Sequence, residues 1–139
     1  MDKKIKEVEK YIKQAMDILQ FPFGLNLCID NNREKYRKKL EVGNCEAALK
    51  LYTLDEPILF ISKNVVLKFC SESEIEKFQA EKTICHELVH GLMKNTLEIA
   101  FDYIKESQSF EINLERDTDI IAERIANMIR IVNRGFSHV

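Results

Sequence analysis

The chain has 139 residues, of which 45% are hydrophobic and 32% charged, and its formal net charge is −2. This length and composition predict one globular domain over residues 1–139. The small net charge argues against nucleic acid and anionic membranes as partners, and no apolar run is long enough to span a bilayer.

The first half of the chain predicts one helix followed by strands. Residues 2–20 place apolar side chains three and four positions apart, the pattern of an amphipathic helix on a core. Residues 25–29 alternate in the manner of a strand. Two further strands are expected over 46–54 and 57–61, joined by a turn at 55–56, and the second is apolar enough to be central.

The second half predicts helices. A short helix is favoured over a strand for residues 63–69. A capping box, either Ser71 with Glu74 or Ser73 with Glu76, starts a helix that runs to about Asn95. The remaining expectations are a helix over 96–105, a polar linker over 106–109, and a last helix over 114–134 that stops at Gly135.

The basic run at residues 33–39 is expected to be a solvated loop or a turn of helix, with an electrostatic patch for substrate or nucleic acid as the alternative. The four cysteines are widely spaced and form no C-x-x-C pair, and the first residues lack the apolar core of a signal peptide. We therefore expect reduced thiols in a cytoplasmic protein, with Cys85 in the core.

The segment His86-Glu87-x-x-His90 has the HExxH spacing of zinc hydrolases. On a helix, positions i and i+4 lie about 40° apart on one face, so both imidazoles can bind one ion. Zn²⁺ accepts such nitrogen donors in a four-coordinate site. Glu87 lies at the edge of this face and can act as the general base on a water. Apolar neighbours on both sides of the segment indicate a buried helix and not a chance surface match.

The third ligand is expected from a carboxylate of the last helix. The only other histidine, His138, follows the expected end of that helix, and a frayed terminus makes a poor ligand. Glu115 and Asp119 lie one turn apart, on a flank that small residues continue and that permits close helix approach. Asp117 flanks the other edge, Glu123 is expected in solvent, and periodicity does not separate Glu115 from Asp117.

The apolar stripe of the last helix is expected to face the core. Its predicted members are Leu114, Ile121, Ile125, Met128 and Val132, with Ala122 and Ile129 at the margin.

His86-Glu87-x-x-His90 followed by Glu115-x-x-x-Asp119 resembles the gluzincin metallopeptidases, in which E-x-x-x-D on a second helix follows HExxH. The resemblance covers roughly residues 57–130. It implies Glu115 as the third zinc ligand and Asp119 as the acceptor for the outer N–H of a ligating histidine, His86.

The short layout resembles that of single-domain gluzincins and of phage- and mobile-element-encoded peptidases that cleave immunity repressors. Two features depart from the family pattern. Leu114 stands where the family has asparagine, and no histidine or tyrosine that would stabilise the oxyanion can be matched. Tyr103 is the nearest candidate by position.

The expected fold is a zincin-like α+β domain, with a small, mostly antiparallel sheet and the His86 and Glu115 helices packed on one face. The expected function is zinc-dependent hydrolysis of peptides or proteins, with His86, His90 and Glu115 as metal ligands and Glu87 as the catalytic base. The substrate would lie extended along a sheet edge. The alternatives are a metallopeptidase-like binding module of phage or mobile-element origin and a two-histidine helix without metal. The sequence leaves the oligomeric state open.

Overall fold

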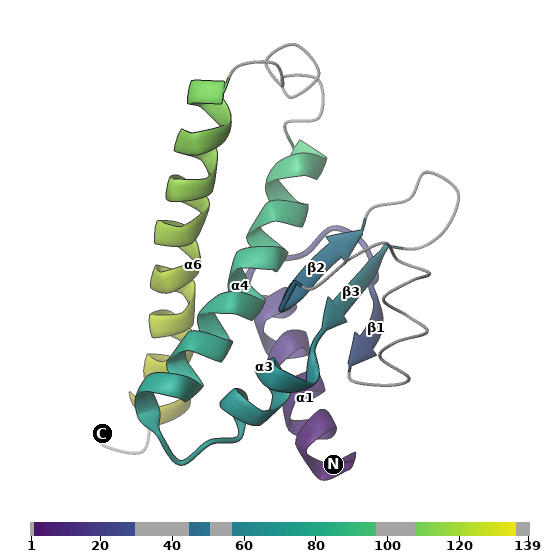
Figure 1. Cartoon of the computed structure of the whole chain (residues 1–139), viewed down its shortest axis with the longest axis vertical. Coiled ribbons are helices and arrows are strands. Elements are labelled where there is room, and N and C mark those ends of the chain that lie inside the picture. Colours follow the sequence, from purple (N-terminus) through teal and green to yellow (C-terminus); the bar gives the residue numbers. More distant parts are fainter. Residues whose placement is uncertain (1, 30–44, 51–56, 97–107, 136–139) are drawn as a thin grey trace.

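The structure, a computed structural model of the whole chain, describes residues 2–29, 45–50, 57–96 and 108–135. Its elements are α1 (Asp2–Ile18), β1 (Asn26–Ile29), β2 (Ala47–Lys50), β3 (Ile58–Ile61), α3 (Lys63–Phe69), α4 (Glu74–Thr96) and α6 (Gln108–Gly135) (Figure 1). The predicted α+β class is confirmed, as are the first helix, the short helix at 63–69 and a strand within each of the three expected ranges. Residues 51–56, the end of the second expected strand and the expected turn, lie outside the described residues.

The sheet has the order β1-β3-β2, and β3 is its central strand. Leu59, Phe60 and Ile61 of β3 are fully buried, as the apolar run at 57–61 predicted. β2 pairs with β3 antiparallel, whereas β1 pairs with β3 parallel. The sheet is therefore mixed, and the expectation of a mostly antiparallel sheet was wrong. Alternation of side chains predicts a strand but not its direction, and the chain between β1 and β3 is long enough for the crossover that a parallel pair needs.

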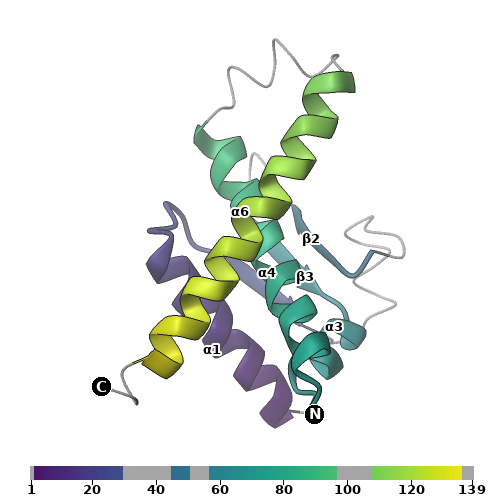
Figure 2. The same ribbon diagram turned by 90° about the vertical axis from the view of Figure 1, so that its left-hand side faces the viewer.

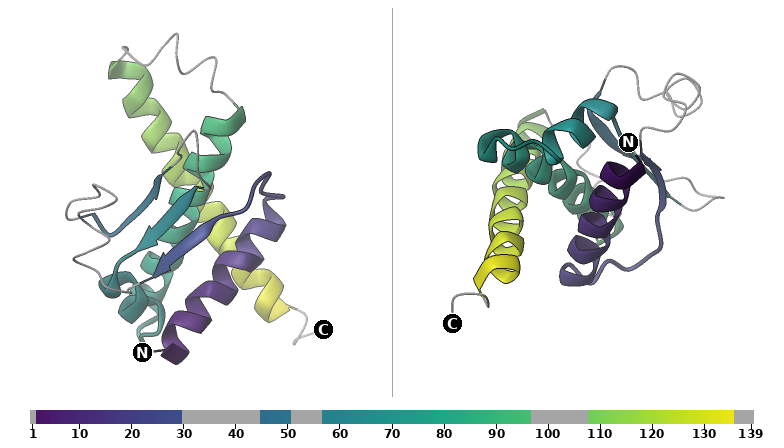
Figure 3. Two further views of the ribbon diagram at one scale, coloured as in Figure 1. Left: turned by 90° about the vertical axis from the view of Figure 1, so that its right-hand side faces the viewer. Right: turned by 90° about the horizontal axis from the view of Figure 1, so that it is seen from below.

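The helices lie on one side of the sheet in two layers. α1 and α4 cover the sheet, and α6 lies across them as the outermost element (Figures 1 and 2). Figure 3 shows the same arrangement from the sheet side and from below. The two helices expected on one face are thus placed differently: α4 packs on the sheet, whereas α6 packs on α4 and runs antiparallel to it.

α1 ends in a Schellman motif that turns the chain back toward the sheet. Gln20 adopts a left-handed conformation with φ of 49°. The Phe21 N–H donates to the Met16 carbonyl over 2.9 Å, and the Gln20 N–H donates to the Asp17 carbonyl over 3.1 Å. The buried face of α1 is Ile5, Val8, Tyr11, Ile12 and Ala15.

Cys85 lies in the core, as predicted, with 0% of its surface exposed. Its sulfur is 3.6 Å from the Tyr11 hydroxyl oxygen, which joins α4 to α1. Burial raises the pKa of Cys85 to about 11, so the thiol stays protonated at neutral pH.

The buried face of α6 differs from the predicted stripe. Ile121, Met128 and Val132 are 40%, 42% and 41% exposed. Ile125 is buried as predicted, and so are Ala122 and Ile129 at the predicted margin, but the other buried residues of this face are Thr118 and Ala126. The small side chains of this face let α6 approach α4 closely, which outweighs the larger apolar area of the predicted stripe. α6 also begins at Gln108, so the expected linker at 106–109 was wrong in its second half.

None of the described helices is both long and apolar enough to cross a membrane. Several features named in the sequence lie outside the described residues: the basic run at 33–39, Tyr103, His138, and all but the first residue of the helix expected at 96–105. The single domain over 1–139 stays a prediction.

Candidate metal centre

α4 carries the HExxH segment and begins at a serine cap. Ser73 Oγ accepts the Glu76 N–H over 3.4 Å, so the second of the two predicted capping pairs is the one at the helix start. The Glu76 carboxylate does not complete the box but accepts from Ser71 Oγ over 2.9 Å. The fully buried face of α4 around the segment is Ile84, Cys85, Leu88 and Val89. Burial of this face sets the rotation of α4 about its axis. Its histidines then face α6, and Glu87 faces β2.

The two histidines face Glu115 of α6. Glu115 places Oε1 2.6 Å from His90 Nε2 and Oε2 3.2 Å from His86 Nε2. The two imidazole rings lie 4.6 Å apart between centroids. One donor atom from each of the three residues lies within 4.8 Å of the others. Two helices distant in sequence thus bring together the three predicted ligands.

Burial lowers the pKa of His90 below its ordinary value, although the neighbouring Glu115 carboxylate pulls in the opposite direction. A lowered pKa keeps the imidazole neutral at physiological pH. The neutral imidazole has the lone pair that a metal ion needs.

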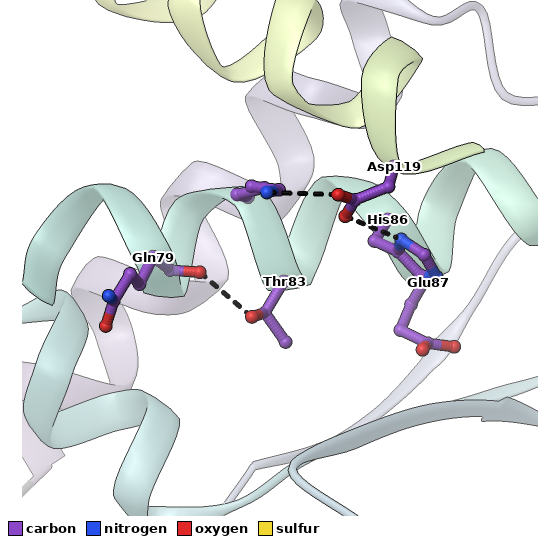
Figure 4. A pocket seen from close by; sticks show the side chains of 6 residues that line it. Gln79, Thr83, His86, Glu87 and Asp119 are labelled. Atoms are coloured by element: carbon purple, nitrogen blue, oxygen red, sulfur yellow. Dashed lines mark hydrogen bonds and ion pairs between the residues drawn. The ribbon is translucent and has the colours of Figure 1, made fainter. Parts of the chain in front are cut away.

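Asp119 lies on the other side of His86. Its Oδ1 is 3.5 Å from His86 Nδ1, and its Oδ2 is 3.1 Å from Lys82 Nζ. Figure 4 shows the Asp119 carboxylate directed at the His86 ring. An acceptor at Nδ1 favours the tautomer whose Nε2 lone pair points toward Glu115 and His90.

Glu87 points away from this cluster, toward the sheet (Figure 4). Its Oε2 accepts the main-chain N–H of Leu49 in β2 over 3.1 Å. Burial raises the pKa of Glu87, against the opposing effects of the Leu49 hydrogen bond and the His86 ring. A raised pKa makes this carboxylate a stronger base toward a nearby proton donor.

Close approach between α4 and β2 depends on Gly91. A Cβ at this position would overlap Leu49 Cδ2 and lie 3.1 Å from Phe21 Cζ. The absence of a side chain at Gly91 therefore leaves room for the Leu49 side chain between α4 and β2.

A pocket of about 310 Å³ opens beside the histidine and glutamate of the HExxH segment. It is lined by Gln79, Lys82, Thr83, His86, Glu87 and Asp119. Figure 4 shows Gln79, Thr83, His86 and Glu87 along α4, with Asp119 reaching toward His86 from α6.

Two other candidate carboxylates take no part in the three-residue cluster. The Asp117 side chain is 56% exposed, with its Oδ1 3.4 Å from Arg116 Nε. Glu123 is half exposed, as expected, but its Oε2 also lies 3.9 Å from Lys82 Nζ.

Sequence reasoning missed two partners of the site. Lys82 lies four residues before His86, so helix periodicity places it on the same face and could have identified it. The Leu49 N–H has no signal in the sequence, because any residue but proline supplies one.

The donor set suits Zn²⁺. Two imidazole nitrogens and one carboxylate are a common catalytic zinc set, and the fourth position of such a site is left for water or substrate. No family model, curated protein or solved structure matches the chain. The chemistry of the site is therefore inferred from its residues and their geometry.

Proposed function

We propose that the protein is a zinc-dependent peptide hydrolase of the gluzincin type. His86, His90 and Glu115 would hold the ion, and Glu87 would be the general base. The observation that carries this proposal is the convergence of three donor atoms within 4.8 Å, with a partly buried carboxylate at the next residue of the same helix. When bound, Zn²⁺ would acidify a water and polarise the scissile carbonyl.

Glu87 supplies the proton transfers. Its carboxylate takes a proton from the water as the oxygen attacks the carbonyl carbon. It then passes that proton to the amine nitrogen as the C–N bond breaks. Burial raises the pKa of Glu87, which makes its carboxylate a better acceptor for the first proton. The Leu49 N–H restrains the carboxylate without neutralising it.

β2 offers an edge for an extended peptide. Among the strands of the described residues, it is the last in the order β1-β3-β2. The Ser62 N–H donates to the Glu46 carbonyl over 2.9 Å, so the main-chain groups of Glu46 face β3. In an antiparallel pair this direction alternates, so those of Ala47 and Leu49 face away from β3. A substrate added as a strand at this edge would pass close to Glu87.

The second candidate is a metal-binding module without catalysis. The pocket lining supports it, because the described residues there include no tyrosine that would stabilise an oxyanion. Two of the donors in this lining are also engaged: Thr83 Oγ1 donates to the Gln79 carbonyl over 2.9 Å, and Lys82 pairs with Asp119. On this reading the site would serve binding and not turnover.

The test compares wild type with Glu87→Gln for zinc content and for cleavage of a random peptide mixture, read by mass spectrometry. If the protein is a hydrolase, wild type and Glu87→Gln should contain equal amounts of zinc, wild type should cleave peptides, and the variant should not. Asp117→Asn, an exposed carboxylate change on α6, is the matched control and should keep both properties. Zinc binding without cleavage by wild type would favour the binding module. Equal cleavage by wild type and Glu87→Gln would reject the mechanism.

A further inference from the structure

The proposed ligands belong to a longer row of charged and polar side chains at the interface of α4 and α6. On α4, Lys82, His86 and His90 recur every four residues. On α6, the facing residues in the same order are Glu123, Asp119 and Glu115. The contacts alternate between the helices, from His90 through Glu115, His86, Asp119 and Lys82 to Glu123, so Lys82 is the member on α4 that lies farthest from His90.

We propose that Lys82 is a positioning residue that orients Asp119, and through it His86, for metal binding; this inference rests on the proposed zinc site. The Asp119 carboxylate has two oxygens, and each faces a different partner: Oδ2 is 3.1 Å from Lys82 Nζ, and Oδ1 is 3.5 Å from His86 Nδ1. The ammonium holds one oxygen, so the other stays directed at the imidazole.

Lys82 also offsets repulsion along α6. Glu115, Asp119 and Glu123 lie at four-residue intervals, a spacing at which like charges on a helix destabilise each other. Lys82 lies near two of these three carboxylates. Its side chain is only 32% exposed, whereas those of Asp119 and Glu123 are 49% and 51% exposed. Lys82 is therefore more restrained by its surroundings than the two carboxylates that it contacts.

A direct charge effect would act in the opposite direction. A cation beside the site repels Zn²⁺, so its removal could tighten binding. We expect orientation to dominate, because Lys82 reaches the His86 ring only through Asp119 and its side chain, 32% exposed, is screened by solvent. The loss of a partner that orients a ligating histidine weakens metal affinity by about 10–100-fold.

The experiment measures the zinc dissociation constant by competition with a chromophoric chelator, at fixed pH and salt. Lys82→Met should weaken binding about tenfold, and Lys82→Arg should stay near wild type. Asp119→Asn should weaken binding at least as much, and Lys82→Met added to Asp119→Asn should change nothing further. Lys13→Met, on α1, is the control for loss of a surface lysine.

Three results would overturn the inference. Lys82→Met could bind zinc as tightly as wild type, or more tightly. It could lower affinity by the same factor with and without Asp119. It could also lower only the thermal midpoint of the metal-free protein, which would show a purely structural role. If wild type itself binds no zinc, the proposed function fails together with the inference. Zinc binding by wild type that is insensitive to Lys82 removes the inference alone.

Discussion

Glu115 Oε1 lies 2.6 Å from His90 Nε2, although the two residues come from different helices. The other oxygen of the same carboxylate lies 3.2 Å from His86 Nε2, so one side chain of α6 contacts both histidines of α4. The contact depends on the small buried residues of α6, which permit the helices to pack closely. Packing between α4 and α6 thus assembles the candidate metal centre.

Replacement of Glu115 should remove most of the zinc affinity. Glu115→Gln deletes the anionic ligand, so the affinity should fall by more than the roughly 10–100-fold caused by losing a residue that contacts only a ligand. Asp117→Asn removes a carboxylate two residues away that points elsewhere, and it should bind as wild type does. Competition with a chelator measures the zinc affinity of both variants. An equal loss of affinity in the two would mean that net charge, and not coordination, determines zinc binding.

Glu87→Gln should stabilise the metal-free protein at high pH. Burial raises the pKa of Glu87 above 4.5, so between that value and the raised one the native state holds more proton than the unfolded state. The contribution of Glu87 to the unfolding free energy of wild type therefore falls as the pH rises from 4.5 to the raised pKa, and it stays low at higher pH. Glutamine does not titrate, and its carbonyl can still accept the Leu49 N–H.

Urea unfolding at a series of pH values measures this difference in unfolding free energy. The advantage of Glu87→Gln should be largest at pH 8 and should shrink as pH falls toward 4.5. A difference that does not change with pH, or a wild type that is the more stable at pH 8, would contradict the effect of burial.

Gly91→Ala should destabilise the protein despite the higher helix propensity of alanine. The new Cβ overlaps Leu49 Cδ2, and overpacking of this kind costs about 1–3 kcal/mol, against a gain of at most about 1 kcal/mol from propensity. Leu49→Ala in the same chain removes the overlapping atom. The double variant should therefore lose less stability than the sum of the single losses, and strict additivity in urea unfolding would disprove the contact.

Arg130→Met should destabilise the protein by about 3–5 kcal/mol, because it leaves a buried carboxylate without its cation. Glu81 is only 4% exposed, and its Oε1 lies 2.6 Å from Arg130 Nε and Nη2. Glu81→Gln combined with Arg130→Met should recover much of the loss. Arg134→Met, which disrupts a pair with the exposed Glu74, should have a much smaller effect in urea unfolding. Similar losses for the two arginine variants would contradict the role of burial.

The sequence predicted the parts of the site that follow from helix periodicity. The four-residue spacing of His86 and His90 requires one face, and the same spacing of Glu115 and Asp119 requires a second face. The gluzincin resemblance singled out Glu115, which the structure brings to both histidines, whereas periodicity alone left it equivalent to Asp117. Whether these residues bind zinc stays a prediction.

The parts that sequence reasoning missed depend on tertiary packing. Ile121, Met128 and Val132 were expected in the core because they are large and apolar, yet they are exposed. The small-residue flank was expected to permit close helix approach, but periodicity did not show that this flank, with Ala122 and Ala126, would be the buried face. The parallel β1–β3 pair likewise has no local signal, since a strand has the same alternation in either direction.

Anomalous diffraction at the zinc edge, from crystals of wild-type protein grown with Zn²⁺, would show whether His86, His90 and Glu115 together bind one ion. We expect one peak between α4 and α6, at about 2.0–2.2 Å from His86 Nε2, His90 Nε2 and a Glu115 carboxylate oxygen. A difference map without density at this position, or an ion held there while Glu115 points into solvent, would contradict this expectation.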